Sequence, residues 1–186
     1  MSDIEIRAVE ESDVTSLRAL FAGLSDRDRT LMKDDMSASG AVERWISDPA
    51  ARFVALDEDR FVALDEDTVV GILAIVPGVA WSRHVAQLRI VVDPARRRRG
   101  IGRALARRGL VEAVSAGRTK LLAEVLADDD AAAALFRAVG FDPEALLKDH
   151  VRDHSGTMRD LLLLSHFVDH AWAAMATTGL DELTEE

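Results

Sequence analysis

Short runs of apolar residues, either alternating with polar ones or continuous, predict seven β-strands along this chain. Residues 4–9 alternate apolar and polar side chains, as expected of a strand that buries one face. Apolar runs at 61–64 and 69–76 flank the polar turn 65–68 and predict a hairpin. The other predicted strands are 85–92, 120–126, 145–151 and 158–164.

Apolar residues spaced three and four apart predict helices between these strands. Ser12-Asp13 and Ser25 precede the first two helices as N-caps, and Gly140 follows the fifth, where a left-handed glycine commonly ends a helix. The predicted helices are 14–24, 25–32, 41–46, 102–115 and 131–139, and a sixth begins near Ser165. This sixth helix has an apolar face that consists of Phe167, Val168, Ala171, Trp172 and Met175. We expect that face either to pack onto the sheet or to form a dimer interface.

The composition is that of a globular protein in a reducing compartment. Of the 186 residues, 48% are hydrophobic, which suits one well-buried domain rather than two. The absence of cysteine excludes disulfides, thiolate metal sites and a cysteine nucleophile. No apolar run reaches the roughly 18 residues of a membrane-spanning helix, and the N-terminal residues are not signal-like. We therefore expect a cytoplasmic protein with no membrane partner.

Charge is unevenly distributed along the chain. The whole sequence carries −10, but residues 93–108 contain seven arginines and one aspartate, so the remainder carries −16. A basic segment in an acidic protein suits a small polyanionic ligand better than a nucleic acid, which the acidic surface would repel. The acidic remainder either favours a cationic substrate or serves only to keep the surface solvated.

The basic segment lies between a predicted strand and a predicted helix. The strand ends at Asp93-Pro94, because proline cannot extend the ladder, and four arginines then lead to Gly100-Ile101-Gly102. Two near-adjacent glycines let the backbone turn tightly and bring its N–H groups close to a ligand. Those N–H groups would lie at the start of a helix, and the N-terminus of a helix favours negative charge. The segment therefore predicts a diphosphate-binding turn, the alternative being an ordinary turn with solvated arginines.

The spacing of the glycines distinguishes this turn from two other phosphate-binding motifs. The chain has no Walker loop, and the dinucleotide fingerprint fails because Leu105 occupies its third glycine position. The pattern Arg/Gln-x-x-Gly-x-Gly/Ala is met by Arg97, Gly100 and Gly102. Directly after a strand that ends in Val-Asp-Pro, this pattern resembles the acetyl-CoA loop of the GNAT superfamily of N-acetyltransferases.

The resemblance extends over nearly the whole chain, because the predicted element order matches that of GNAT proteins. It implies the α/β (α+β) fold of the acyl-CoA N-acyltransferases, a mixed, largely antiparallel central sheet of about seven strands flanked by helices. Residues 1–180 would form this single domain, with the C-terminal helix as an addition, and 181–186 an acidic tail. Residues 135–141, LFRAVGF, also resemble the family's LYxxxGF motif.

The resemblance further implies the residues that bind acetyl-CoA as co-substrate. The backbone of Ile90, Val91 and Val92 would pair with the peptide-like pantetheine arm. The turn would hold the pyrophosphate through main-chain N–H groups and the 3′-phosphate through its arginine side chains. The residues of the turn that would contact the co-substrate are Arg97, Arg98, Arg99, Gly100, Ile101, Gly102 and Arg103. The family's usual Asn and Tyr are Asp129 and Phe136 here, and Phe136 packs in the core, lines the thioester channel, or does both.

Two departures from the family pattern leave the catalytic groups open. The chain contains no tyrosine, so the phenol that many relatives offer as general acid is missing. The strand region where relatives often place a glutamate holds Ala86 and Gln87, which cannot act as a base. The remaining candidates are Glu124 and His84, the alternatives being an ordinary strand carboxylate and an ordinary loop histidine.

The acceptor pocket is expected between residues 25–46 and the loop 77–84. Its proposed walls are Trp45 and Trp81, and the carboxylates that would attract a cation are Asp34, Asp35 and Glu43.

The other histidines add two hypotheses. His150 and His154 flank the predicted turn between the last two strands, where they would contact the substrate. His166 and His170 are four residues apart, but no glutamate follows the first as in a zinc protease motif, so no metal site is expected.

One repeat has no functional explanation. The octapeptide RFVALDED occurs twice in succession, at 52–59 and 60–67. The second copy leads into strand 69–76 and is assigned to the hairpin, while the first would form a short extra hairpin or a bulge. Identical copies can also compete for one strand position.

The residues and the resemblance together predict an acetyl-CoA-dependent N-acetyltransferase. It would move an acetyl group to a primary amine of a small molecule, peptide or protein by direct attack. The alternative is an acetyl-CoA-binding sensor or regulatory module with little or no catalysis. A nucleic-acid binder is disfavoured, because the arginines lack aromatic stacking partners and the chain is acidic. The sequence leaves open the amine and the oligomeric state, with a homodimer among the options.

Overall fold

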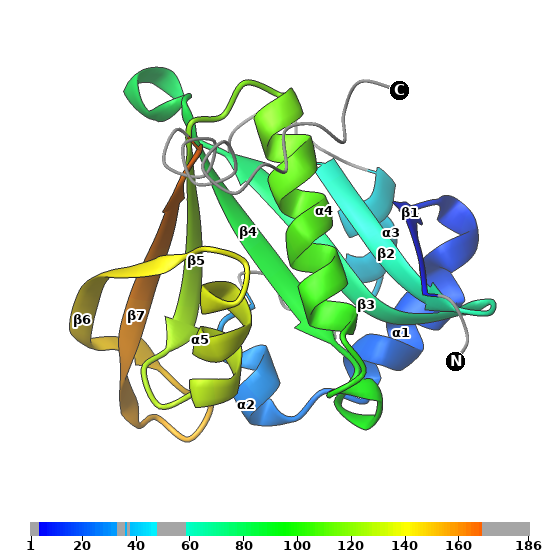
Figure 1. Ribbon diagram of the computed structural model, residues 1–186. Helices are drawn as coiled ribbons and strands as arrows, with labels where there is room; N and C mark the ends of the chain where they lie inside the picture. Colours follow the sequence, from blue (N-terminus) through cyan, green and yellow to red (C-terminus); the bar gives the residue numbers. More distant parts are fainter. Residues whose placement is uncertain (1–3, 33–35, 37, 48–58, 169–186) are drawn as a thin grey trace.

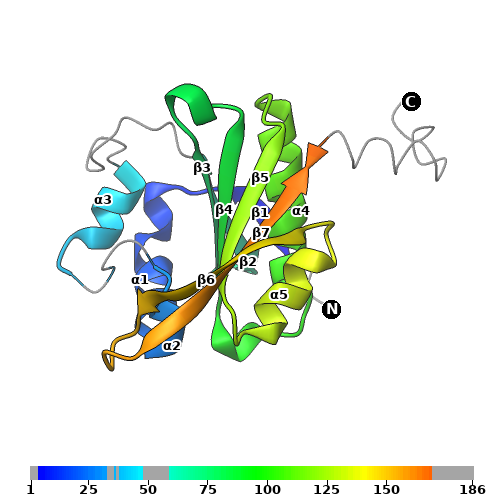
Figure 2. The same ribbon diagram turned by 90° about the vertical axis from the view of Figure 1, so that its left-hand side faces the viewer.

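The computed structural model describes residues 4–32, 36, 38–47 and 59–168, which form one seven-stranded sheet with helices on both faces (Figures 1 and 2). The strands are β1 (Glu5–Ala8), β2 (Asp59–Asp65), β3 (Thr68–Pro77), β4 (Val85–Val92), β5 (Lys120–Leu126), β6 (Asp142–Arg152) and β7 (Met158–Phe167). The helices are α1 (Val14–Ala22), α2 (Asp26–Arg29), α3 (Ala41–Ser47), α4 (Ile101–Ser115) and α5 (Asp130–Arg137).

The sheet is mixed and largely antiparallel, which confirms the predicted fold class. The strands lie in the order β1-β2-β3-β4-β5-β7-β6. Every neighbouring pair is antiparallel except β4 and β5, which run parallel because α4 provides the crossover between them.

Two apolar layers enclose the sheet. Helices α1, α2 and α3 cover one face, and α4 and α5 cover the other (Figure 2). Leu105 of α4 is fully buried against Leu73 and Leu88 on one side, whereas Phe21 and Trp45 pack with Ile72 on the other. Within the described residues, no helix has the length and apolar character needed to cross a membrane.

The second copy of the repeated octapeptide forms β2, as predicted. Phe61 pairs with Ala8 of β1 on one side and with Leu73 of β3 on the other. The first copy lies outside the described residues except for Asp59, with which β2 begins.

The C-terminal part differs from the prediction in two places. Strand β6 begins at Asp142 rather than at residue 145, because Asp142 already pairs with Ser165. Residues 165–167 belong to β7, so the helix predicted to begin near Ser165 is wrong there. Their pairing with Lys120–Leu122 of β5 overrides the helical spacing of their apolar side chains. Val168, which follows β7, is buried, and the part of that predicted helix from residue 169 onward, with the acidic tail, lies outside the described residues.

Candidate active site

Strands β4 and β5 pair at one end and separate at the other (Figure 1). The parallel pairing joins Val85–Gln87 to residues 120–122 and extends no further, although both strands continue. The outer edge of β4 stays paired with β3 as far as Val92, and that of β5 stays paired with β7 as far as Leu126. The inner edges of residues 88–92 and 123–126 therefore border an opening in the sheet.

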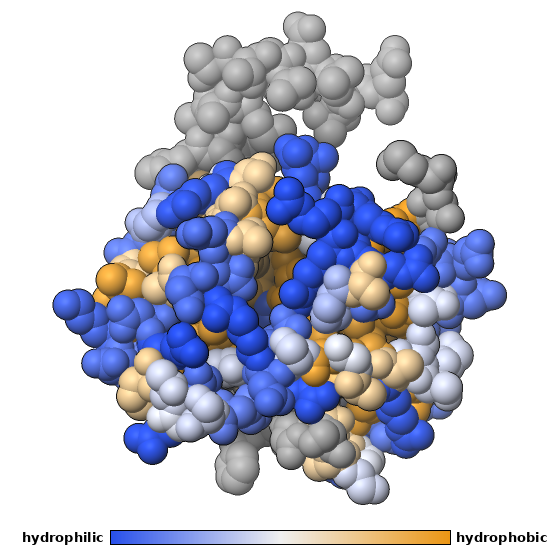
Figure 3. All heavy atoms as spheres, turned by 90° about the horizontal axis from the view of Figure 1, so that it is seen from below, coloured by the Kyte–Doolittle hydropathy of each residue, from blue (hydrophilic) through white to orange (hydrophobic). Residues whose placement is uncertain are grey.

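A cleft of about 820 Å³ occupies this opening. Both separated strands line it, together with residues of α2, of the glycine turn and of α5. Figure 3, which views the end of the molecule that carries the glycine turn, shows apolar atoms in a hollow between hydrophilic rims. The predicted cofactor residues that line the cleft are Ile90, Val91, Val92, Arg97, Arg98, Gly100, Ile101, Gly102, Arg103, Asp129 and Phe136.

The glycine turn presents its main-chain N–H groups at one end of the cleft. Arg98 and Gly100 both have left-handed backbone conformations, with φ of +66° and +83°. No residue that the structure describes accepts a hydrogen bond from the N–H groups of residues 98–103, and the first such bond in this segment joins Ala104 N–H to the Gly100 carbonyl. Successive N–H groups in such a turn, at the start of the 15-residue helix α4, form an anion-binding concavity.

Helix α2 connects the two walls of the cleft by ion pairs. Asp28 contacts Arg97 of the glycine turn at 2.5 Å, and Arg27 contacts Asp128, after β5, at 2.8 Å. Burial raises the pKa of Asp28, but hydrogen bonds from Ser25 and Arg97 outweigh it and hold that pKa below its ordinary value. The hydrogen bond to Asp128 raises the pKa of Arg27. Charge at the mouth of the cleft is thus partly compensated within the protein.

Asp129 and Phe136 take structural roles as well as lining the cleft. The Asp129 carboxylate accepts a hydrogen bond from Ala132 N–H at 3.0 Å and so caps the N-terminus of α5. Phe136 is buried, and its ring meets that of Phe141 edge-on with centroids 5.2 Å apart. Phe136 therefore packs in the core and also lines the cleft.

The two candidate bases lie in different places. Glu124 on β5 is half-buried and lines the cleft. His84 is exposed at the start of β4 and lines neither this cleft nor the second cavity. It lies five residues before Arg89, roughly 16 Å along the strand. The Arg99 side chain is also exposed and outside the cleft lining, although its main-chain N–H belongs to the glycine turn. The structure therefore does not bring the side chains of His84 and Arg99 into the cleft.

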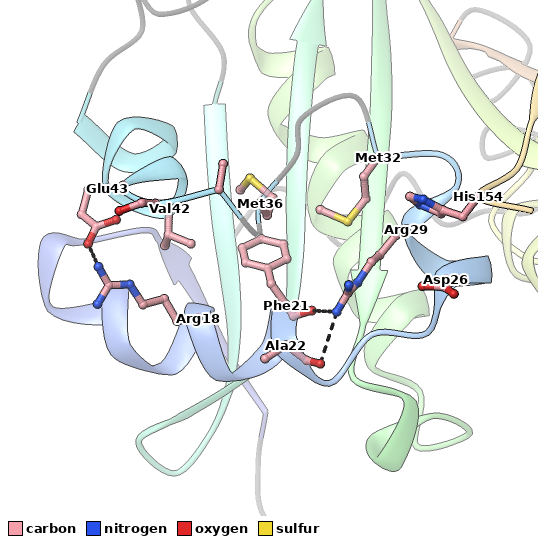
Figure 4. A pocket seen from close by; sticks show the side chains of 13 residues that line it. Arg18, Phe21, Ala22, Asp26, Arg29, Met32, Met36, Val42, Glu43 and His154 are labelled. Atoms are coloured by element: carbon pink, nitrogen blue, oxygen red, sulfur yellow. Dashed lines mark hydrogen bonds and ion pairs between the residues drawn. The ribbon is translucent and has the colours of Figure 1, made fainter.

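A second cavity of about 860 Å³ adjoins the cleft on the face covered by α1 and α3 (Figure 4). The two cavities share Phe21, Met32 and Met36 as lining residues, and Figure 4 shows the Phe21 ring next to Met36, with Met32 nearer to Arg29 and His154. At its rim, Arg18 pairs with Glu43, and the Arg29 guanidinium donates to the carbonyls of Phe21 and Ala22 at the end of α1.

The structure brings one of the two predicted wall residues of the acceptor pocket to the cleft, and not the other. Trp45 lines the cleft, but Trp81 is 89% exposed and lines neither cavity. The loop that carries Trp81 lies at the opposite end of β4 from the glycine turn (Figure 1). The second cavity is lined instead by a residue of the β6–β7 turn, His154. His150, the other predicted substrate contact in this region, does not line it. Glu43 lines this cavity, whereas Asp34 and Asp35 lie outside the described residues.

The sequence analysis missed several lining residues, among them Phe21, Met32, Met36 and Arg89. Phe21, Met32 and Met36 resemble ordinary core residues in the sequence, and only the fold places them between the two cavities. Arg89 carries a sequence signal, because a charged residue within the apolar strand 85–92 requires a partner when that strand is buried. In the structure Arg89 is half-buried, and Gln87 Oε1 accepts hydrogen bonds from its Nε and Nη2 at 3.3 and 3.1 Å.

The fold places a turn of unbonded main-chain N–H groups and two separated strand edges around one cleft, an arrangement suited to an extended anionic ligand. The family model of the acetyltransferase (GNAT) family matches residues 25–141, which is more than half of the chain. The protein belongs to this family, and acetyl-CoA is the co-substrate that the family uses.

Solved structures of acetyltransferases share the fold over nearly the whole chain. The ribosomal-protein-alanine N-acetyltransferase from Brucella melitensis is 25% identical, with a TM-score of 0.72 over 88% of this chain and 99% of its own. A putative acetyltransferase from Salmonella typhimurium, solved with acetyl-CoA, is 18% identical with a TM-score of 0.71 over 89% and 94%. The spermidine N-acetyltransferase from Vibrio cholerae, solved with CoA and spermine, is 19% identical with a TM-score of 0.72 over 90% and 96%. No curated protein sequence matches the chain.

Proposed function

We propose that this protein transfers the acetyl group of acetyl-CoA directly to a primary amine. The observation that carries the proposal is the opening between β4 and β5, which joins a turn of unpaired main-chain donors to a half-buried carboxylate. The residues present fit acetyl-CoA, because the turn suits a diphosphate and the free edge of β4 suits the amides of pantetheine.

The glycine turn and β4 would hold the co-substrate. Main-chain N–H groups of residues 98–103 bind the diphosphate, and the arginines of the turn add positive charge for the phosphates. The inner edge of residues 88–92 pairs with the pantetheine arm as an added strand would. A substituent on Gly100 would project into open space, since a Cβ built there meets no atom within 4 Å. When bound, acetyl-CoA supplies an acetyl thioester to the cleft.

Glu124 is the candidate base of this proposal. An alkyl amine has a pKa near 10.4, so providing its neutral form at pH 7 costs roughly 4–5 kcal/mol unless a protein group removes the proton. Glu124 lines the cleft on the strand facing β4, and the structure does not bring His84 to this site. We therefore assign the removal of the amine proton to Glu124 and leave His84 out of the mechanism.

The leaving thiolate receives its proton from water in this mechanism. The chain contains no tyrosine, and the corresponding position holds Phe136, whose ring has no proton to donate. General-acid assistance typically increases a rate by about 10²–10⁴-fold, so the step that releases the thiol proceeds without this increase.

The experiment that tests the proposal measures thiol release from acetyl-CoA over a panel of primary amines. We expect release to depend on an added amine and to disappear in Gly100→Glu, because a carboxylate there repels the diphosphate. Gly117→Glu is the matched control, since Gly117 also has a positive φ, of +74°, and open space around it but does not line either cavity.

One observation favours a second function, an acetyl-CoA-binding module without catalysis. The position of the family's tyrosine is occupied by Phe136, which is buried and packed against Phe141. This alternative predicts that CoA raises the melting temperature of the protein while no amine yields an acetylated product. Amine-dependent thiol release would reject it.

A further inference from the structure

The acceptor side of the cleft is apolar around a small group of polar side chains. Phe21 and Trp45 meet edge to face with ring centroids 6.2 Å apart, and both line the cleft together with Met32, Met36 and Ile72. All of these lie on the face of the sheet that α1 and α3 cover. A ligand on this side therefore contacts aromatic, thioether and aliphatic groups along its length.

Arg89 and Glu124 occupy corresponding positions on the two separating strands. The last parallel pair joins Gln87 to Leu122, so two residues further along each strand Arg89 would stand opposite Glu124. Because side chains alternate in a strand, both belong to the same face as that pair, and both line the cleft. A positive and a negative group thus border the place where β4 and β5 begin to diverge.

The spacing of these two charges suits a zwitterion. Neighbouring strands lie about 4.8 Å apart where they pair and further apart where they diverge. An α-amino acid carries its ammonium and its carboxylate on one carbon and spans such a gap. Its two charges are opposite in sign to the two side chains that they would face, so each can form a charge-assisted contact.

The rim of the second cavity does not select for a polycation. Its described lining contains two arginines and two carboxylates, Arg18, Arg29, Asp26 and Glu43, and Arg18 pairs with Glu43. A second ammonium group of a polyamine would approach Arg89 or one of these arginines, which is unfavourable.

We propose that the acceptor is a free α-amino acid with an apolar side chain. The inference rests on the proposed acetyl transfer. The carboxylate pairs with the Arg89 guanidinium, which Gln87 orients from the same strand. The ammonium faces Glu124, and the side chain extends toward Phe21 and Met36. Arg89 is thereby the residue that determines specificity for the carboxylate.

The reaction with such an acceptor balances without a further reactant. Glu124 takes one proton from the ammonium, and the neutral nitrogen forms a bond to the acetyl carbonyl carbon. The carbon–sulfur bond breaks, the nitrogen gives up its second proton, and the thiolate is protonated. The products are an N-acetyl amino acid, CoA thiol and one proton released to solvent.

The test compares acceptors that differ only in the carboxylate. We expect kcat/KM for L-phenylalanine to exceed that for L-phenylalanine amide and 2-phenylethylamine by roughly 10- to 150-fold. This factor is the one expected from a single charged hydrogen bond, here between the substrate carboxylate and Arg89. Spermidine and L-glutamate should be poorer still. Arg89→Gln should abolish the preference for the acid, whereas Arg83→Gln, at an exposed arginine that lines neither cavity, should retain it.

Each outcome of this test decides the inference. Equal use of L-phenylalanine and its amide by the wild-type protein overturns it, as does a preference that survives in folded Arg89→Gln. If Arg89→Gln does not fold, Arg89→Lys should still lower the preference severalfold, because lysine lacks the forked donors of arginine. If no amine is acetylated, the proposed function fails, and calorimetry on the CoA-loaded protein then decides the ligand class. Binding of L-phenylalanine but not of 2-phenylethylamine would support it, and the reverse would reject it.

Discussion

The substitution Gly100→Ala tests the phosphate-binding role of the glycine turn most directly. Gly100 has φ of +83°, and a Cβ built there meets no atom within 4 Å. The only folding cost is therefore the left-handed backbone, roughly 1–2 kcal/mol for an L-residue. For a protein of this size we expect the melting temperature to fall by about 2–8 °C.

The same substitution should weaken CoA binding by more than its folding cost suggests. If the backbone relaxes away from φ of +83°, the N–H groups of residues 100–102 no longer point into the cleft together. Losing one hydrogen bond to a charged diphosphate costs about 1.5–3 kcal/mol, which is about 10- to 150-fold in Kd. Isothermal titration calorimetry with CoA measures this change directly.

Gly117→Ala is the control that separates folding from binding. Gly117 has φ of +74° and equally open surroundings, but it follows α4 at the end away from the cleft. We expect a similar loss of thermal stability with an unchanged Kd for CoA. Equal affinities of Gly100→Ala and Gly117→Ala would refute the assignment of the diphosphate to the turn.

Three further predictions address catalysis, the core and acid stability. Glu124→Gln should lower kcat for amine-dependent thiol release by about 10²–10⁴-fold and leave the Kd for CoA within twofold. Leu105→Ala should lower the free energy of unfolding in urea by ~2.7–5 kcal/mol, because Leu105 is fully buried between α4 and the sheet. Hydrogen bonds from Ser155 and Arg159 lower the pKa of Asp153 from 3.8 to about 2, so its stabilising effect is complete above about pH 4 and lost as pH falls toward 2. Asp153→Asn should therefore be less stable than wild type in urea at pH 7, and the difference should shrink as pH falls from about 4 through 2.

Each of these predictions has an outcome that contradicts it. An unchanged kcat in Glu124→Gln would remove the carboxylate from the mechanism. Leu146, which is 53% exposed, provides the comparison for the core, and Leu146→Ala should cost less than about 0.5 kcal/mol. A destabilisation of Leu105→Ala as small as that would contradict the packing of α4. For Asp153, a stability difference that stays constant between pH 7 and pH 2 would show that its contacts do not depend on the carboxylate charge.

Local patterns in the sequence were sufficient to predict most of the fold and the glycine turn before α4. Proline at 94 and glycines at 100 and 102 act through the backbone of their own residues, so their effect is visible without tertiary structure. The same holds for α4, whose buried positions recur at helical spacing, and for the strands up to Leu126. The helix predicted from Ser165 failed because pairing with β5, more than forty residues earlier in the chain, determines that segment.

The sequence by itself therefore determined the order of most elements and the glycine turn, since each depends on residues close together in the chain, and acetyl-CoA followed from the resemblance to the GNAT superfamily. Only the tertiary structure decided where β4 and β5 separate, which brings Glu124 and Arg89 to one cleft and leaves His84 and Trp81 outside it. The physical reason is that strand register, and the helices that cover each face, depend on contacts between distant segments. No local spacing of residues specifies them.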